Sequence, residues 1–147
     1  MEEQHIPDFI VIDDDYINNV ICQLIIQNEL KATKIIFFTV PQKGLEYIEA
    51  TYSGPEANDA VLFLDINMPV LNAWDVLDQL KNSSEWVKHH LRIFIFSSSL
   101  SHQDKQRAAD NPLVSGYIEK PLKPIDLQNI LGNRPSGQTP VPFLFYT

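Results

Sequence analysis

The stretch 61–69 reads Val-Leu-Phe-Leu-Asp-Ile-Asn-Met-Pro, and it decides the fold more than any other part of the chain. Its four leading apolar residues predict a strand that is buried on both faces, as in a parallel sheet. Asp65 stands where this strand emerges, and Pro69 cannot continue a central strand. In open α/β sheets, ligands bind outside the carboxyl ends of the strands. The aspartate is therefore either a functional residue at that edge or an ordinary turn residue.

A second apolar run, Phe9–Ile12, ends in three consecutive carboxylates, Asp13, Asp14 and Asp15. Carboxylates that share a pocket repel each other unless a cation is present. Asp15 is a suitable N-cap for the helix that follows, but this role does not explain Asp13 and Asp14. Hard oxygen ligands of this kind suit Mg²⁺.

Two further strands also end in polar residues. The segment 92–96 is followed by Ser97, and the segment 115–118 leads to Lys120, which precedes Pro121. Taken singly, these serine and lysine residues are more typical of a loop, a cap or a solvated surface. Taken together, the strand ends supply acids, a hydroxyl and an ammonium group, which are the components of a metal-assisted phosphoryl-transfer site.

Ile35–Phe38 predicts one more strand, and segments with helical spacing alternate with the strands. The helices are predicted by Ile17, Val20, Ile21, Leu24 and Ile25; by Pro41, Leu45 and Ile48; by Trp74, Leu77 and Leu80; by the polar segment 101–109; and by 125–131. The segment 82–90, which carries Trp86, His89 and His90, is expected to be a connection with its histidines on a surface loop. This alternation predicts an α/β three-layer sandwich with a five-stranded parallel sheet. The flavodoxin-like (βα)5 order 2-1-3-4-5 brings the four polar strand ends together.

These segments resemble, in order, type and spacing, the receiver domain of two-component response regulators, of the single-domain, chemotaxis-receiver type. The resemblance covers roughly residues 9–131. It implies that Asp65 is the phosphoacceptor. It also implies that Asp13 and Asp14 hold Mg²⁺ together with Asp65 and the backbone carbonyl of Asn67.

The same resemblance implies roles for three residues near the ends of the last two strands. Ser97 stands at the hydroxyl position, Lys120 would pair with the phosphoryl group, and Tyr117 falls at the aromatic switch position. It further implies a cis peptide bond between Lys120 and Pro121. One departure is Asn72-Ala73, where the family often has Asp-Gly, and it is expected to alter the loop slightly.

The implied function is transfer of a phosphoryl group to Asp65 from the phosphohistidine of a sensor histidine kinase or a histidine phosphotransfer protein. Such a protein is not a classical enzyme, although it catalyses its own phosphorylation and slow dephosphorylation. It would signal to an unknown downstream protein through the face formed by the fourth helix, the fifth strand and the fifth helix. Two alternatives remain: a small haloacid-dehalogenase-like phosphohydrolase that uses the Asp13–Asp15 motif, and a degenerate receiver that acts only as an interaction module.

Composition limits the remaining classes. The 147 residues suit one domain, and the net charge of −8 with a pI near 4.8 argues against direct binding of nucleic acid. No apolar run approaches the roughly 20 residues that a membrane span needs. The single cysteine, Cys22, excludes an internal disulfide, is expected to be buried, and fits a cytoplasmic location.

The receiver domain is expected over residues 1–132, and a tail over residues 133–147. The end of the tail is strongly apolar, and exposed aromatic residues would form an adhesive patch. We therefore expect Phe143 and Phe145 to dock on this domain or on a second copy, which would give a homodimer. The alternative is a disordered terminus.

Overall fold

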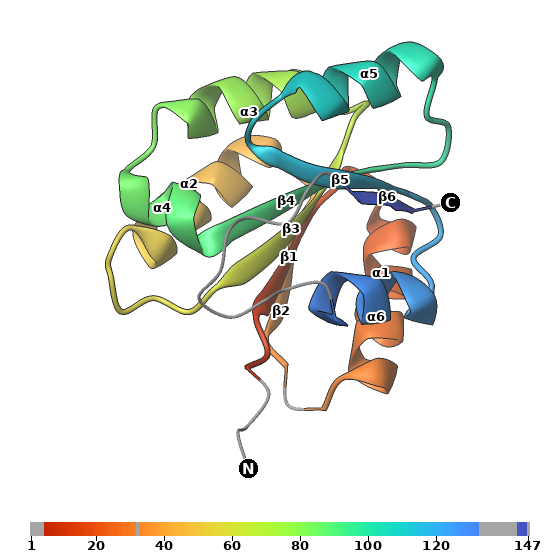
Figure 1. Ribbon diagram of the computed structural model, residues 1–147, viewed down its shortest axis with the longest axis horizontal. Helices are drawn as coiled ribbons and strands as arrows, with labels where there is room; N and C mark the ends of the chain where they lie inside the picture. Colours follow the sequence, from red (N-terminus) through yellow and green to blue (C-terminus); the bar gives the residue numbers. More distant parts are fainter. Residues whose placement is uncertain (1–4, 32, 133–143, 147) are drawn as a thin grey trace.

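The computed structural model describes residues 5–31, 33–132 and 144–146. Within these residues, parallel strands form one six-stranded sheet in the order β2-β1-β3-β4-β5-β6, with helices on both faces (Figure 1). The strands are β1 (Asp8–Ile12), β2 (Ile35–Phe38), β3 (Ala60–Asp65), β4 (Leu91–Ser97), β5 (Val114–Glu119) and β6 (Leu144–Tyr146). The helices are α1 (Tyr16–Glu29), α2 (Pro41–Tyr52), α3 (Ala73–Lys81), α4 (Glu85–His90), α5 (His102–Asp110) and α6 (Pro124–Gly132). The predicted order 2-1-3-4-5 is confirmed, and β6 extends it by one strand.

Alternate residues of each strand enter two separate cores, because successive side chains point to opposite faces of a sheet. One core lies under α2, α3 and α5, and the other lies under α1 and α6. Every residue of β3 is buried, as its continuous apolar sequence predicts for a central parallel strand. Because the whole strand is buried, Asp65 is held at the carboxyl-terminal edge of the sheet.

Helix α1 forms where predicted, but several of its apolar residues do not face the sheet. Ile17, Ile21 and Leu24 are exposed, with 69%, 40% and 61% of their surface accessible. The buried residues of α1 are Asn18, Asn19, Cys22 and Ile26. A buried carboxylate beneath the first turn explains this orientation, because it requires amide donors rather than methyl groups.

The segment 82–90 contains a helix, α4, where only a connection was expected. Ser84 caps this helix by accepting a hydrogen bond from the N–H of Val87 at 3.2 Å, and the Val87 side chain is fully buried. One cap and one buried apolar contact are sufficient for so short a helix in a tertiary context.

The expectation that His90 lies on a surface loop is wrong. His90 ends α4, and only 5% of its surface is exposed. Its Nδ1 lies 3.1 Å from a carboxylate oxygen of Asp59, and its Nε2 lies 2.9 Å from the carbonyl oxygen of Gly54. His90 therefore ties α4 to the loop that precedes β3.

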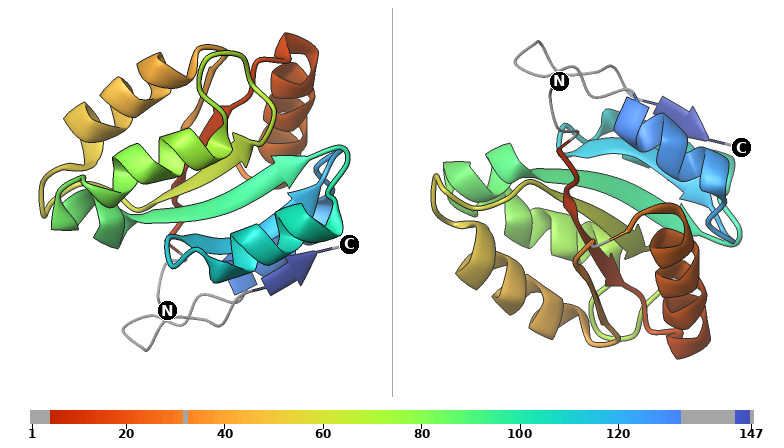
Figure 2. Two further views of the ribbon diagram at one scale, coloured as in Figure 1. Left: turned by 90° about the horizontal axis from the view of Figure 1, so that it is seen from above. Right: turned by 90° about the horizontal axis from the view of Figure 1, so that it is seen from below.

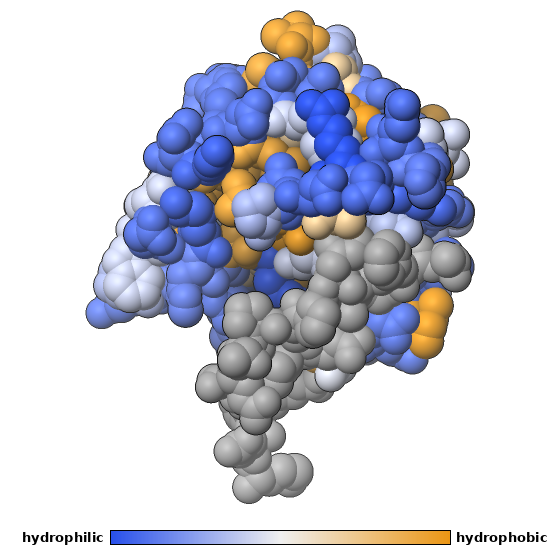
Figure 3. Space-filling model, turned by 45° about the horizontal axis from the view of Figure 1, so that its top comes forward, coloured by the Kyte–Doolittle hydropathy of each residue, from blue (hydrophilic) through white to orange (hydrophobic). Residues whose placement is uncertain are grey.

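Helix α5 is held differently from the other helices. Ala108 is its one buried residue. The Lys105 ammonium lies 5.5 Å from the centre of the Tyr117 ring, and the Arg107 guanidinium lies 4.5 Å from the centre of the Trp74 ring. The face over α3 and α5 is accordingly largely hydrophilic (Figure 3). Cation–π contacts thus replace much of the usual apolar stripe.

The C-terminal residues 144–146 lie along the outer edge of β5 as the parallel strand β6 (Figure 2). Phe145 stands opposite Tyr117 in this pairing. The expected docking of Phe143 concerns a residue outside the described part of the chain. In that described part, no helix is both long and apolar enough to cross a membrane.

Candidate functional site

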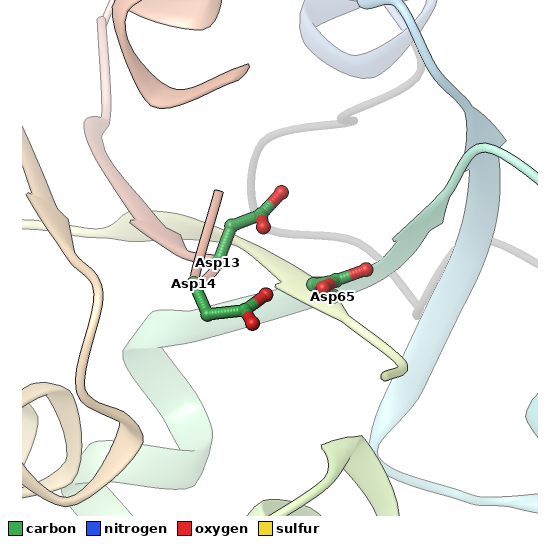
Figure 4. A group of neighbouring side chains, drawn as sticks. All are labelled: Asp13, Asp14 and Asp65. Atoms are coloured by element: carbon green, nitrogen blue, oxygen red, sulfur yellow. The ribbon is translucent and has the colours of Figure 1, made fainter. Parts of the chain in front are cut away.

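Three carboxylates gather at the carboxyl ends of β1 and β3 (Figure 4). Asp13 and Asp14 follow β1, and Asp65 ends β3, which is the neighbouring strand. One carboxylate oxygen from each residue lies within 4.8 Å of the others. Asp13 is completely buried and Asp65 is 6% exposed, whereas Asp14 is exposed. The cluster is therefore open to solvent on the side of Asp14.

Asp13 accepts a hydrogen bond at each of its oxygen atoms. Its Oδ1 accepts the N–H of Asp15 at 2.9 Å, and its Oδ2 accepts the amide of Asn18 at 2.7 Å. The amide of Asn19 donates to the Asp13 carbonyl oxygen at 2.9 Å. Asp15 also caps α1 by accepting the N–H of Asn18 at 3.2 Å, as predicted. The first turn of α1 is thus built around the buried carboxylate.

Lys120 reaches the cluster from the end of β5. Its ammonium lies 2.6 Å from Oδ2 of Asp13 and 3.3 Å from Oδ1 of Asp65. Its backbone N–H donates to the carbonyl oxygen of Ser97 at 2.9 Å, which ties β5 to β4 at this level. The Lys120–Pro121 bond is cis, as the resemblance implied.

One ammonium group does not balance three carboxylates, and the titration of Asp65 reflects this. Burial, and then the charge of Asp13, raise the pKa of Asp65 to about 6, although Lys120 opposes the rise. Burial alone would lower the pKa of Lys120, but its contacts with Asp13 and Asp65 outweigh burial and raise this pKa. The ammonium therefore stays charged at neutral pH, whereas Asp65 gains a proton as the pH falls toward 6.

The loop between β3 and α3 carries Asn67, whose side chain is exposed two residues beyond Asp65. Val70 has a φ of 70°, and the N–H of Leu71 donates to the Pro69 carbonyl oxygen at 2.8 Å, which closes a tight turn. A β-branched residue is a strained choice at positive φ. Val70 is also 98% exposed.

The departure at Asn72-Ala73 is accommodated without strain. Asn72 accepts the N–H of Asp75 at 3.0 Å, and the Asp75 carboxylate accepts the N–H of Asn72 at the same distance, which forms a reciprocal cap for α3. Val70 is the one described non-glycine residue with a positive φ, so Ala73 does not adopt the conformation that would favour glycine.

Ser97 and Tyr117 lie on the neighbouring strands β4 and β5. Ser97 ends β4 and is buried, and its hydroxyl oxygen accepts the N–H of Ser99 at 3.3 Å. Tyr117 is 5% exposed, and it packs in the core shared with α2, α3 and α5. Burial, and then the charge of Glu119, raise the pKa of Tyr117, so its phenol is neutral at physiological pH.

Asn18 and Asn19 are site residues that sequence reasoning missed. Both are buried in α1, where neighbouring isoleucine and valine residues dominated the pattern. The available signal was two adjacent amides in the helical turn that follows three aspartates, because buried carboxylates need donors. The same helix places Cys22 next to the site, with its sulfur 3.8 Å from the Asn18 amide nitrogen. Burial, and then the charge of Asp13, raise the pKa of this thiol to about 12.

The donor set fits a small hard cation. Asp13, Asp14 and Asp65 offer carboxylate oxygens only, and their combined charge exceeds that of Lys120. Oxygen ligands with one exposed member suit Mg²⁺, which keeps several of its waters. In the described part of the chain, this is the one group of three such side chains.

Comparison with known proteins identifies the family to which this fold belongs. The family model of the response regulator receiver domain matches residues 9–132. No curated protein sequence matches the chain significantly.

Several solved structures share the fold. A two-component response regulator from Cytophaga hutchinsonii is 27% identical, with a TM-score of 0.77, and the match covers 88% of this chain and 99% of that one. A response regulator receiver protein from Dyadobacter fermentans is 24% identical, with a TM-score of 0.78 and coverage of 86% and 95%. The chemotaxis protein CheY4 of Vibrio cholerae, at 16% identity, shares the fold with a TM-score of 0.68 and coverage of 86% and 97%. Because the family model spans most of the sequence, the chain belongs to the response regulator receiver family.

Proposed function

We propose that this protein accepts a phosphoryl group on Asp65 from the phosphohistidine of a partner, either a sensor histidine kinase or a histidine phosphotransfer protein. The observation that carries the proposal is the Lys120 ammonium between Asp13 and Asp65, in a cluster with excess negative charge. A phosphoryl acceptor needs this combination of a carboxylate nucleophile, a fixed cation and room for a metal ion.

In the transfer step, a carboxylate oxygen of Asp65 attacks the phosphorus atom of phosphohistidine. The P–N bond breaks, and its electron pair returns to the imidazole, which takes up a proton from solvent. The product is an acyl phosphate on Asp65. Such transfer depends mainly on positioning and charge, and the buried Asp65 is held rigidly by β3.

Mg²⁺ would be held by Asp13, Asp14, Asp65 and the carbonyl of Asn67. When bound, it supplies positive charge that offsets these carboxylates and the phosphoryl oxygens. Asn18 and Asn19 hold Asp13 in place for this role through the hydrogen bonds described above.

After transfer, Lys120 would neutralise one phosphoryl oxygen. The Ser97 hydroxyl would leave its hydrogen bonds with Ser99 and donate to a second phosphoryl oxygen. Ser97 pairs with Glu119 across the sheet, two residues from Tyr117, so its rearrangement would act on the Tyr117 ring and on α5. The output surface would then be the face of α5, β5 and α6. The weak apolar attachment of α5 suits a segment that rearranges at low cost.

The position of Asp15 argues against the phosphohydrolase alternative. In that reading the Asp13–Asp15 motif does the chemistry, but the Asp15 side chain caps α1. The alternative also leaves Asp65 and Lys120 without a task. The degenerate receiver is disfavoured because none of the expected acidic or basic residues is missing.

Incubation with acetyl phosphate and Mg²⁺ separates the three readings. We expect one phosphoryl group per chain by intact mass, sensitive to hydroxylamine and absent from Asp65→Asn. Steady hydrolysis of p-nitrophenyl phosphate would favour the phosphohydrolase, and no reaction at all would favour the degenerate receiver. Labelling that persists undiminished in Asp65→Asn would contradict the assignment of the acceptor.

A second measurement tests the metal ligands. Asp14→Ala should lose most of the rise in melting temperature that Mg²⁺ causes, whereas Asp15→Ala should keep it. Asp15→Ala serves as the matched control because it removes a neighbouring carboxylate whose role is to cap α1. Equal losses in the two variants would mean that the ligand pair is wrongly assigned.

A further inference from the structure

The outer edge of β5 is covered by a strand that lies outside the part of the chain matched by the family model. That match ends at residue 132, whereas β6 spans 144–146. Without β6, β5 would be the last strand of the sheet. An open edge presents unpaired N–H and C=O groups to any extended segment. The cover therefore changes what this side of the molecule can bind.

The pairing is specific in register. Gly116, Tyr117 and Ile118 stand opposite Leu144, Phe145 and Tyr146, in parallel orientation. The sequence around β6 suits this role, because residues 143–146 are all apolar or aromatic, as strands favour. Pro140 and Pro142 precede them, and proline cannot donate a ladder hydrogen bond.

The covered strand is also the strand that reaches the acidic cluster. Lys120 follows Ile118 by two residues, and its ammonium contacts Asp13 and Asp65 at 2.6 and 3.3 Å. A phosphoryl group on Asp65 would draw this ammonium away from Asp13 and shift the end of β5. The residues that pair with β6 lie immediately before this point.

We propose that β6 is an intramolecular cover of the β5 edge. It withholds this edge from other extended apolar segments, and phosphorylation of Asp65 releases it. The release step rests on the proposed function, whereas the covering of the edge does not. The occupant is the C-terminal strand of the same chain, which pairs with β5 in parallel. A tethered strand competes at an effective concentration on the order of millimolar.

The covering is tested with a fluorescent synthetic peptide that has the sequence of residues 140–147. Phe145→Pro in the full chain removes one donor from β6 and fixes its φ, which should expose the β5 edge. Ser136→Pro is the matched control, since it adds a proline to the tail outside β6. Fluorescence anisotropy should show binding to Phe145→Pro that is at least about tenfold tighter than to wild type or Ser136→Pro.

The competing outcomes each overturn the covering. One is a folded Phe145→Pro variant, judged by its circular dichroism and cooperative melting, that does not bind the peptide. Another is equal binding by all three proteins. A wild-type dimer by light scattering that Phe145→Pro dissociates would show that the strand pairs between copies instead.

The release is tested by amide hydrogen exchange at residues 116–118. Exchange should become faster when the wild type is labelled with acetyl phosphate and Mg²⁺, and should stay unchanged in Asp65→Asn. Labelled wild type with unchanged exchange overturns the release. If no label forms on the wild type, the proposed function fails and the release step fails with it, while the peptide result still decides the covering.

Discussion

The two ends of the sheet treat their carboxylates in opposite ways. At the amino end, Asp8 accepts hydrogen bonds from the Tyr52 hydroxyl at 2.8 Å and the Asn58 amide at 3.0 Å, and Asp59 faces His90 at 3.1 Å. At the carboxyl end, three carboxylates share one ammonium group.

Polar groups that are matched with donors stabilise a fold, whereas carboxylates with too little counter-charge are costly in the absence of a ligand. We therefore call the amino end of the sheet, with Asp8 and Asp59, the structural end. We call the carboxyl end, with the three carboxylates and Lys120, the reactive end. Each of the following predictions tests one side of this comparison.

The largest effect should follow from removing the cation of the reactive end. Lys120→Met should slow labelling by acetyl phosphate about 10²-fold, since a fixed donor to the developing charge is lost. Lys123→Met, on the same loop with a more exposed side chain, is the control and should label at the wild-type rate. The rates are read from intact mass against time. Similar rates in both variants would remove Lys120 from the mechanism.

The charge excess should also appear in the pH dependence of stability. Between about pH 4 and 6, the folded protein holds a proton on Asp65 that the unfolded chain has released. The free energy of unfolding therefore falls as pH rises through this range, by at most about 3 kcal/mol.

Asp65→Asn should flatten this slope and raise the melting temperature at pH 7.5 in EDTA. Asp78→Asn, which removes an exposed carboxylate of α3, should keep the slope. Urea titrations at several pH values give the free energies. A variant Asp65→Asn with an unchanged slope would show that burial and the charge of Asp13 do not raise the pKa of Asp65 in the folded protein.

At the structural end, His90→Ala should cost about 2 kcal/mol, because it removes a buried ring that contacts both the Asp59 carboxylate and the Gly54 carbonyl. Labelling at Asp65 should be unaffected. The exposed neighbour supplies the control, His89→Ala, whose free energy of unfolding should stay near that of wild type. Slower labelling with unchanged stability in His90→Ala would break the division between the ends.

The smallest effect concerns the strained loop of the reactive end. Val70→Gly should raise the free energy of unfolding by about 1 kcal/mol, because glycine accepts a φ of 70° without strain. Val40→Gly, at an exposed valine with a φ of −112°, should lower it instead. Urea denaturation compares the two. Destabilisation by both substitutions would mean that Val70 carries no strain.

The reactive end was far more predictable from sequence than the structural end. Asp13 and Asp65 each come directly after an apolar run that is long enough to define a buried strand, and Lys120 follows a shorter predicted strand. Parallel strands place their carboxyl ends together. The topology then brought the three residues together without further information. His90 gave no such signal, because its burial depends on a loop that precedes it by more than thirty residues in the chain.

The buried face of α1 shows a different limit. Hydrophobic spacing predicted the helix, but Asn18 and Cys22 rather than Ile17 and Leu24 face the sheet. A buried carboxylate outweighed the apolar pattern, and this competition is visible only once Asp13 is known to be inside. The strain at Val70 was equally hidden, since sequence alone does not reveal φ.

The position of Cys22 makes its thiol a chemical probe for the motion of α1. The thiol is completely buried next to Asn18, whose amide holds Asp13. Its pKa is raised to about 12, which leaves almost no thiolate, the reactive form. Alkylation therefore requires an opening of the structure that exposes this thiol, and an opening that lifts α1 from the sheet would also take Asn18 and Asn19 away from Asp13. As the chain has a single cysteine, the rate at which one reagent is consumed measures the frequency of openings at this helix.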